Sequence, residues 1–257
     1  MTVFTCNHDI VSIFSCVYDA MKSRLGHENI KLMYEPILQC SFLDEYVHVE
    51  PDYDKAEKVT KAIQNKISTY VYREITYCTL SNEENALDNL YRVLLLGFAY
   101  GKNVLDMEQY EAIYLNRRIR KSVKTEICHF QEFSRFHQIR GNARDTLYIA
   151  HIEPHARVVM ALGPAFMDRM PSENWMIVDD INKEAVVHPK DEMYYLKTLS
   201  DDDIERLLLT EMENDEYTDL WKLFFDNIAI KERKNEKCQN TLMPKWTRKH
   251  AVEWNMK

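Results

Sequence analysis

Apolar residues recur at helical spacing through most of the first 140 positions of the chain. Within Ile10–Arg24 the apolar side chains fall at i, i+3, i+4 and i+7, which places them on one face of a helix. The same reasoning predicts helices over Asp54–Thr69, Asn82–Tyr100 and Asp106–Phe133. The N-terminal region is therefore predicted to be a mainly helical layer.

The pattern changes after the turn signal Gly141-Asn142. In chain order, it predicts the strand Thr146–Ile152 and the helix Arg157–Met170. Three strands follow: Trp175–Val178, Glu184–His188 and Tyr194–Leu196. A helix capped by Ser200–Asp203 and a last helix over Tyr217–Lys234 come next. A β-α-β-β order indicates a small, mostly antiparallel sheet packed on helices. We expect an α+β fold with a helical N-terminal layer and C-terminal helices. It forms one domain over residues 1–257, or, if subdivided, a helical region over residues 1–140 and an α+β region over residues 141–257.

Composition narrows the classes of function. Hydrophobic residues make up 46% of the 257 positions, enough for a substantial core, and the net charge of −8 argues against a globally basic surface. The chain has five glycines and neither a GxGxxG nor a GxxxxGK pattern. Phosphate-cradling loops need closely spaced glycines, so a nucleotide-driven motor or a dinucleotide-dependent oxidoreductase is disfavoured. We predict no cofactor.

The cysteines and the longest apolar run bear on location. None of the six cysteines forms a CxxC pair, and no secretory signal is present, which favours reduced thiols in the cytoplasm. The apolar run Val93–Ala99 is too short to span a bilayer. We therefore expect a cytoplasmic protein without membrane association.

Candidate chemistry is concentrated in and after the predicted strand Thr146–Ile152. Alternation along a strand places His151, Glu153 and His155 on one face, where they can bind a divalent metal or transfer a proton. Pro154 interrupts this pattern, because proline usually marks the edge or end of a strand. Glu153 and Asp179 are the candidate catalytic carboxylates. For Asp179, which follows a buried strand, ordinary turn chemistry is the competing interpretation.

Two basic groups are candidate contacts for nucleic acid. On a helix, four basic residues share one face and can follow phosphates: Arg117, Arg120, Lys121 and Lys124. Arg135 extends this stripe. The second group ends the chain and includes Arg233 and Lys249, interleaved with Trp246 and Trp254, as in proteins that stack aromatic rings on bases. A solvated helix face and tail-end solubility are the competing interpretations.

Motifs over the second half of the chain resemble those of a known family. They are Glu132-Phe133-Ser134-Arg135-Phe136, Leu147–Ala150, Glu153-Pro154, Trp175–Asp179, Trp221–Phe225, Ile228–Ile230, Glu232–Asn235, Gln239, Met243-Pro244 and Lys249-His250. In this order they are similar to a bacterial family of DNA-metabolism proteins whose activity is unknown. The resemblance implies a gene that accompanies a radical SAM protein of DNA repair or modification.

Some members of that family continue into a uracil-DNA-glycosylase-like domain. This sequence ends shortly after Met243-Pro244, so we expect no glycosylase chemistry of its own, and a uracil-DNA-glycosylase-like protein becomes a candidate partner. Family members carry histidines near Ala165 and Val178, where this chain has none. The resemblance therefore favours five other residues as functional: Arg135, Glu153, Asp179, Arg233 and Asn235.

Three classes of function fit the sequence. The first is a non-catalytic DNA-binding adaptor of a radical SAM repair enzyme, with weak, salt-sensitive DNA binding. The second is an enzyme that acts on nucleic acid through Glu153, and the third is a structural subunit. We rank the adaptor first, because no motif supplies a recognisable nucleophile or cofactor loop. Aromatic residues in Tyr217–Phe225 and Lys245–Trp254 are expected to contact the partner, unless they face the protein's own core.

Overall fold

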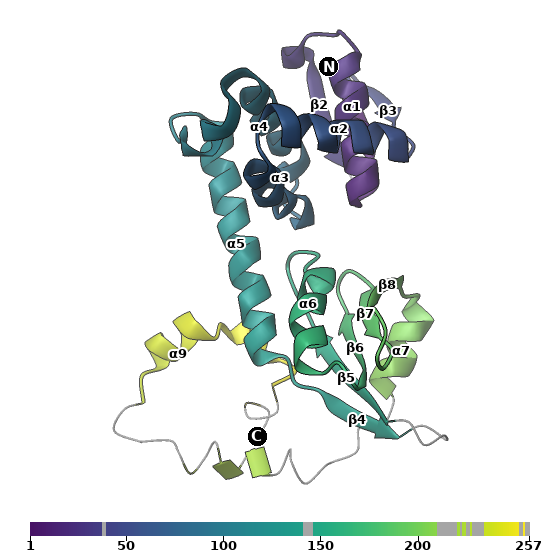
Figure 1. The fold of residues 1–257 in the computed structure, drawn as a ribbon, viewed down its shortest axis with the longest axis vertical. Coiled ribbons are helices and arrows are strands. Elements are labelled where there is room, and N and C mark those ends of the chain that lie inside the picture. The colour runs from purple at the N-terminus through teal and green to yellow at the C-terminus, as the bar shows by residue number, and fades with distance from the viewer. Residues whose placement is uncertain are drawn as a thin grey trace. The chain divides into compact units, whose positions relative to one another are not determined.

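The structure is a computed structural model that describes residues 1–37, 40–140, 146–209, 220, 221, 223, 224, 227, 234–251 and 254. The chain divides into two compact units, Met1–Lys124 (unit 1) and Thr125–Lys257 (unit 2). Both units contain helices and a sheet, so the predicted α+β class is confirmed (Figure 1). The long helix α5 (Glu111–Phe133) begins in unit 1 and ends in unit 2.

Unit 1 contains a three-stranded parallel sheet that the sequence analysis did not predict. Strand β1 (Thr2–Cys6) lies between β2 (Ile30–Tyr34) and β3 (Glu45–His48), and both pairings are parallel. Four consecutive residues of β1, from Val3 to Cys6, are buried. A strand covered on both faces shows no alternation of polar and apolar residues, which is why a period of two was absent here.

The helices predicted for unit 1 are confirmed, with small changes at their ends. They are α1 (Ile10–Lys22), α2 (Tyr53–Lys66), α4 (Ala86–Tyr100) and α5, to which the structure adds α3 (Thr69–Thr76) and the 3₁₀ turns η1 (His27–Asn29), η2 (Cys78–Leu80) and η3 (Gly101–Asp106). Side chains of Asp9, Asp52 and Ser68 cap α1, α2 and α3 by accepting backbone N–H groups at 3.0–3.1 Å. These caps satisfy donors that the first turn leaves unpaired.

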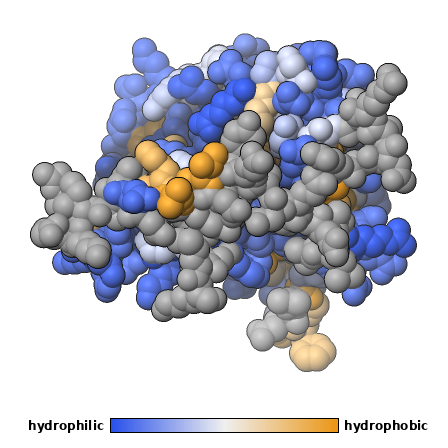
Figure 2. Space-filling view, turned by 90° about the horizontal axis from the view of Figure 1, so that it is seen from below, coloured by the Kyte–Doolittle hydropathy of each residue, from blue (hydrophilic) through white to orange (hydrophobic). Residues whose placement is uncertain are grey.

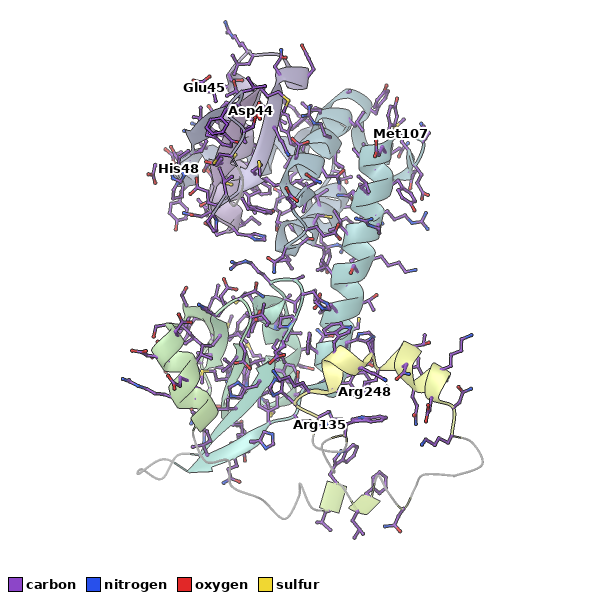
Figure 3. All side chains as sticks on the ribbon, turned by 180° about the vertical axis from the view of Figure 1, so that it is seen from behind. Asp44, Glu45, His48, Met107, Arg135 and Arg248 are labelled. Atoms are coloured by element: carbon purple, nitrogen blue, oxygen red, sulfur yellow. The ribbon has the colours of Figure 1, made fainter. Side chains whose placement is uncertain are left out.

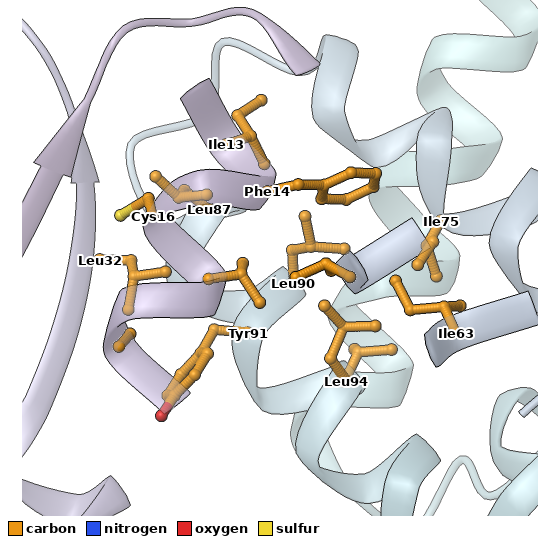
Figure 4. Close-up of a cluster of buried hydrophobic side chains, with 14 of the residues drawn as sticks. Ile13, Phe14, Cys16, Leu32, Ile63, Ile75, Leu87, Leu90, Tyr91 and Leu94 are labelled. Carbon is orange, nitrogen blue, oxygen red and sulfur yellow. The ribbon is translucent and has the colours of Figure 1, made fainter. Parts of the chain in front are cut away.

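The apolar faces of these helices meet in one core beside the parallel sheet. Figure 4 shows Phe14 of α1 and Ile63 of α2 among Leu90, Tyr91 and Leu94 of α4, all of them fully buried. The helical spacing that predicted these elements is thus the spacing of the residues that fill the core.

Unit 2 is built on a five-stranded sheet in the order β4-β5-β6-β7-β8. The strands are β4 (His137–Arg140), β5 (Thr146–Ile152), β6 (Asn174–Asp179), β7 (Glu184–His188) and β8 (Tyr195–Thr198). Helix α6 (Val159–Arg169) connects β5 to β6, which are parallel, whereas the other three pairings are antiparallel. The predicted β-α-β-β order and the mostly antiparallel character are confirmed for this sheet, and β4 is an addition.

Helix α7 (Asp201–Leu209) follows the sheet and begins as predicted. Ser200 Oγ accepts the Asp203 N–H at 3.1 Å, and Asp203 Oδ2 accepts the Ser200 N–H at 3.0 Å, so the two residues cap each other. Helix α9 (Glu236–Leu242) and the 3₁₀ turn η5 (Lys245–Arg248) follow nearer the C-terminus. The helix predicted over Tyr217–Lys234 lies largely outside the described residues.

Within the described ranges, no helix combines the length and apolarity needed to cross a membrane. All six cysteines are free thiols. On the face drawn in Figure 2, hydrophilic residues predominate and hydrophobic ones gather in small groups.

Candidate functional site

The carboxyl ends of the parallel strands β5 and β6 bring two carboxylates to one edge of the sheet. Ile152 is in register with Asp179, and the Asp180 N–H continues the pairing by donating to the Ile152 carbonyl at 3.1 Å. Glu153 and Asp180 are the next residues of the two strands, so they leave the sheet together. In open α/β sheets, this edge is where ligands most often bind.

Glu153, Asp180 and His250 form a compact group, here called the strand-end cluster. His250 Nε2 lies 3.6 Å from Glu153 Oε1 and 3.7 Å from Asp180 Oδ2. Among the residues that the structure describes, this is the group of three whose ligand atoms are close enough together, within 4.8 Å, to hold a metal ion. The Lys249 ammonium pairs with the same Glu153 oxygen.

His151 supports the strand-end cluster from inside the sheet. Its imidazole is buried, with Nδ1 at 2.9 Å from Asp180 Oδ1. An ionised carboxylate only accepts, so Nδ1 carries the proton and donates it. The Nε2 atoms of His151 and His250 are both buried without a hydrogen-bond partner. Burial lowers the pKa of the His250 imidazole, although the Asp180 and Glu153 carboxylates oppose this effect, so the neutral ring is favoured.

A pocket of about 530 Å³ opens beside the strand-end cluster and shares Glu153 with it. Its lining comes from the strand-end loops and from η5: Glu153, Pro154, His155, Ile181, Lys245, Trp246 and Lys249. The Trp246 ring is held at 4.2 Å from the His155 ring and at 5.8 Å from the Phe130 ring, measured between centroids. The pocket lining therefore combines an aromatic ring with two lysines.

The three residues predicted as metal ligands do not come together in the structure. Glu153 belongs to the strand-end cluster, and His151 reaches it only through Asp180. The side chain of His155 is 70% exposed and lies against Trp246, while its backbone N–H donates to the buried carboxylate of Glu126. The physical reason is that β5 ends at Ile152, so the alternation assumed through Pro154 does not continue.

Asp179 is held in a turn, which was the competing interpretation of this residue. Its fully buried carboxylate accepts the N–H groups of Ile181 and Asn182 at 3.0 and 2.9 Å, and the Asn182 side-chain amide at 2.7 Å. Burial raises the pKa of Asp179 to about 6 against these hydrogen bonds. Asp180, and not Asp179, is the aspartate that belongs to the strand-end cluster.

The basic stripe on α5 is largely neutralised within unit 1. Arg117 pairs with Glu108, and both Arg120 and Lys124 pair with the buried carboxylate of Glu74, at 3.3 and 2.7 Å. Lys121 is the exposed remainder of the predicted stripe. A charge that already neutralises a buried carboxylate contributes less to phosphate binding, because the buried charge would lose its partner.

The other predicted nucleic-acid contacts are dispersed. The Arg135 guanidinium lies over the Trp221 ring at 5.4 Å, and the Asn235 side chain caps α9. Arg233 lies outside the described residues. Of the residues proposed for nucleic-acid binding, Lys249 is the one in the pocket.

Arg248 fixes the segment that delivers Lys249 and His250. Its guanidinium donates to the carbonyls of Gln239 and Met243 at 2.6–3.0 Å and lies 3.9 Å from the centre of the Trp254 ring. Figure 3 labels Arg248. The sequence analysis treated Lys249 as a nucleic-acid contact and Lys249-His250 as a family motif, and did not place either residue beside Glu153. No spacing along the chain indicates that they meet Glu153, whereas Asp180 was signalled by its position after a strand.

Unit 1 has a polar cluster at its own strand ends. Thr5 Oγ1 donates to Glu35 Oε1 at 2.6 Å, and His48 Nδ1 lies 2.7 Å from the same oxygen; Figure 3 labels His48. The Thr5 hydrogen bond, followed by that of His48, lowers the pKa of Glu35, and Glu35 in turn raises the pKa of His48. Glu35 is thus satisfied by both Thr5 and His48 within unit 1.

The fold and the site together define an α+β protein with a carboxylate–histidine cluster beside a pocket lined by lysines and a tryptophan. Residues 84–253 match the family described as domain of unknown function DUF4130. The match covers more than half of the chain, so this protein belongs to the DUF4130 family. The strand-end cluster and the pocket lie inside the matched segment, and residues 1–83 lie outside it. A search of curated proteins found no match.

Proposed function

We propose that this protein is a DNA-binding accessory protein of DNA metabolism, which holds a single-stranded segment in the pocket of unit 2 and works with a radical SAM protein. The observation that supports DNA binding best is the pocket lining, which combines Trp246 with Lys245 and Lys249. A base can stack on the indole while Lys245 attracts an adjoining phosphate. The volume of about 530 Å³ is in the range of ligand-binding pockets.

The pocket is a better candidate than the α5 stripe for electrostatic reasons. Arg120 and Lys124 neutralise Glu74 in unit 1, whereas Lys245 is exposed and lines the pocket. Each cation that contacts a phosphate releases condensed counterions, so binding should be weak and strongly salt-dependent.

Fluorescence anisotropy with a single-stranded oligonucleotide at several salt concentrations tests the pocket. Lys245→Gln should lower affinity and reduce the log–log salt slope by about 0.7, the value for one phosphate contact on a single strand. Lys121→Gln on α5 is the matched control and should leave the slope unchanged. A slope that falls in the control and not in Lys245→Gln would place DNA on the stripe.

Substitution of the tryptophan tests base stacking. Trp246→Ala should weaken single-strand binding by about 1–3 kcal/mol, the usual contribution of one stacked base. Because Trp246 also packs on Phe130, the melting temperature must be measured in parallel. Unchanged affinity in a folded variant would remove base stacking from the proposal.

The proposed contact with the radical SAM protein is supported by an exposed aromatic group in unit 2. Four described apolar residues here have side chains open to solvent: Leu220, Trp221, Leu223 and Phe224. Trp221 lies beside Phe224 and under Arg135, and tryptophan with arginine is a frequent anchor of interfaces. Trp221→Ala should reduce co-purification with the radical SAM protein, whereas Tyr53→Ala, at an exposed aromatic of unit 1, should not. Equal recovery of both variants would contradict this surface.

The strand-end cluster favours one alternative function, an enzyme acting on nucleic acid with Glu153 as base. In that case, Glu153→Gln should abolish turnover of DNA while the Lys245-dependent binding persists. A wild-type protein that binds DNA and leaves it chemically unchanged favours the accessory role.

A further inference from the structure

We propose that Glu153, Asp180 and His250 bind a divalent transition-metal ion. This inference concerns the metal alone and does not depend on DNA binding. The ligand set is two carboxylates and one imidazole, which suits Zn²⁺ or Mn²⁺ better than Mg²⁺ or Ca²⁺, since the latter prefer oxygen ligands only. Three protein ligands leave a coordination position open for water or substrate, as in catalytic zinc sites.

Two of the three ligand separations approach those around a tetrahedral ion, and all three lie within 4.8 Å. Ligands at about 2.1 Å from a tetrahedral zinc are separated by roughly 3.4 Å from one another. His250 Nε2 is 3.6 Å from Glu153 Oε1 and 3.7 Å from Asp180 Oδ2. These separations are too long for hydrogen bonds and within a few tenths of an ångström of the spacing that a shared ion needs.

The hydrogen bonding around the three residues points to the same atoms. His250 Nε2 is buried and has no hydrogen-bond partner, although it faces two carboxylate oxygens. His151 Nδ1 lies 2.9 Å from Asp180 Oδ1 and 3.2 Å from Asp180 Oδ2, and that second oxygen is the one 3.7 Å from His250 Nε2. A buried histidine that orients a ligating carboxylate is the usual outer shell of a metal site.

The Lys249 ammonium competes with a metal ion for Glu153. The ammonium pairs with Glu153 Oε1, the oxygen that would ligate the ion. A metal ion must therefore displace this ion pair, and removal of the ammonium should strengthen metal binding. If these residues are only a surface ion-pair network, loss of Lys249 should leave the affinity for a metal ion unchanged.

Calorimetric titration of chelator-treated, full-length protein with ZnCl₂ or MnCl₂ tests the proposal. We expect one ion per chain, with affinity at least tenfold lower in Glu153→Gln, Asp180→Asn and His250→Gln, and about 10–100-fold lower in His151→Gln. His155→Gln, an exposed imidazole of the same pocket, is the control and should bind like the wild type. Lys249→Met should bind more tightly.

A spectroscopic measurement on the wild-type chain keeps the test informative if a variant misfolds. Co²⁺ bound by the three residues should give the intense visible bands of a tetrahedral site, and one equivalent of Zn²⁺ should bleach them. Absence of stoichiometric binding to the wild type, or binding that persists in all three ligand variants, would overturn the proposal.

Discussion

Asp179 and Asp180 are adjacent in the sequence, and their side chains point to different surroundings. Asp179 ends β6, is fully buried and accepts three hydrogen bonds from the turn that follows. Asp180 points to the other side, toward His151 and His250. Side chains alternate at the end of a strand, so a single position separates a structural carboxylate from a candidate ligand.

The buried carboxylate of Asp179 should make stability depend on pH. Its pKa is raised by burial from 3.8 to about 6, so the protonated form stabilises the fold below about pH 4 and this contribution is lost as pH rises through 6. The Asp179→Asn side chain cannot ionise. The free energy of unfolding of this variant, relative to that of the wild type, should therefore rise between pH 4 and 7, by about 3 kcal/mol at most. Urea unfolding at several pH values measures this difference, and parallel pH curves for the two proteins would show that Asp179 does not titrate in this range.

At the scale of elements, hydrophobic spacing was sufficient to predict the long helices and the strands β5, β6 and β7. It failed for the sheet of unit 1. Strand β1 is a short buried run, and its partners β2 and β3 follow much later in the sequence. Parallel pairing of distant segments is decided by tertiary packing, and no local pattern records it.

The strand-end cluster was predictable only to a limited extent, for the same reason. Glu153 follows a recognisable strand, and Asp180 follows the next one, so parallel pairing of β5 with β6 would have joined them. His250 comes from a distant segment, since its neighbour Lys249 is 96 positions from Glu153 along the chain. The contact of His250 with Glu153 and Asp180 depends on how η5 packs, and no residue spacing in the sequence predicts that packing.

The cap of α7 offers a test at this scale. Ser200→Ala removes the acceptor of the Asp203 N–H and should lower the free energy of unfolding by about 1 kcal/mol. Ser200→Thr retains a hydroxyl and should cost little. Chemical denaturation of both variants measures the difference, and equal stability would mean that α7 does not depend on this cap.

At the scale of the whole molecule, each unit contains a hydrophobic cluster of its own residues. One cluster joins the helices and sheet of unit 1, and another lies around Ile149 and Val178 on the sheet of unit 2. The candidate site is built entirely from residues of unit 2. A destabilising substitution in the core of unit 1 should therefore increase local unfolding first within that unit.

Ile63→Ala tests this separation. Ile63 is completely buried, so the cavity should cost about 2–5 kcal/mol. Amide hydrogen exchange should accelerate in α1 and α2 and remain slow in β5 and β6, whereas Val178→Ala should give the reverse. Uniform acceleration through both sheets in either variant would show that the chain opens as one cooperative unit.

The parallel register of β5 and β6 also determines which changes of chain length this family can tolerate. Glu153 and Asp180 meet because the two strands end at the same level. An insertion in the connection between α6 and β6 leaves that level unchanged. An insertion of one residue within β6 moves Asp180 by one step, and because each step reverses the face of the sheet, its carboxylate turns away from His151. Insertions and deletions among relatives should therefore fall in the connections and spare the strand.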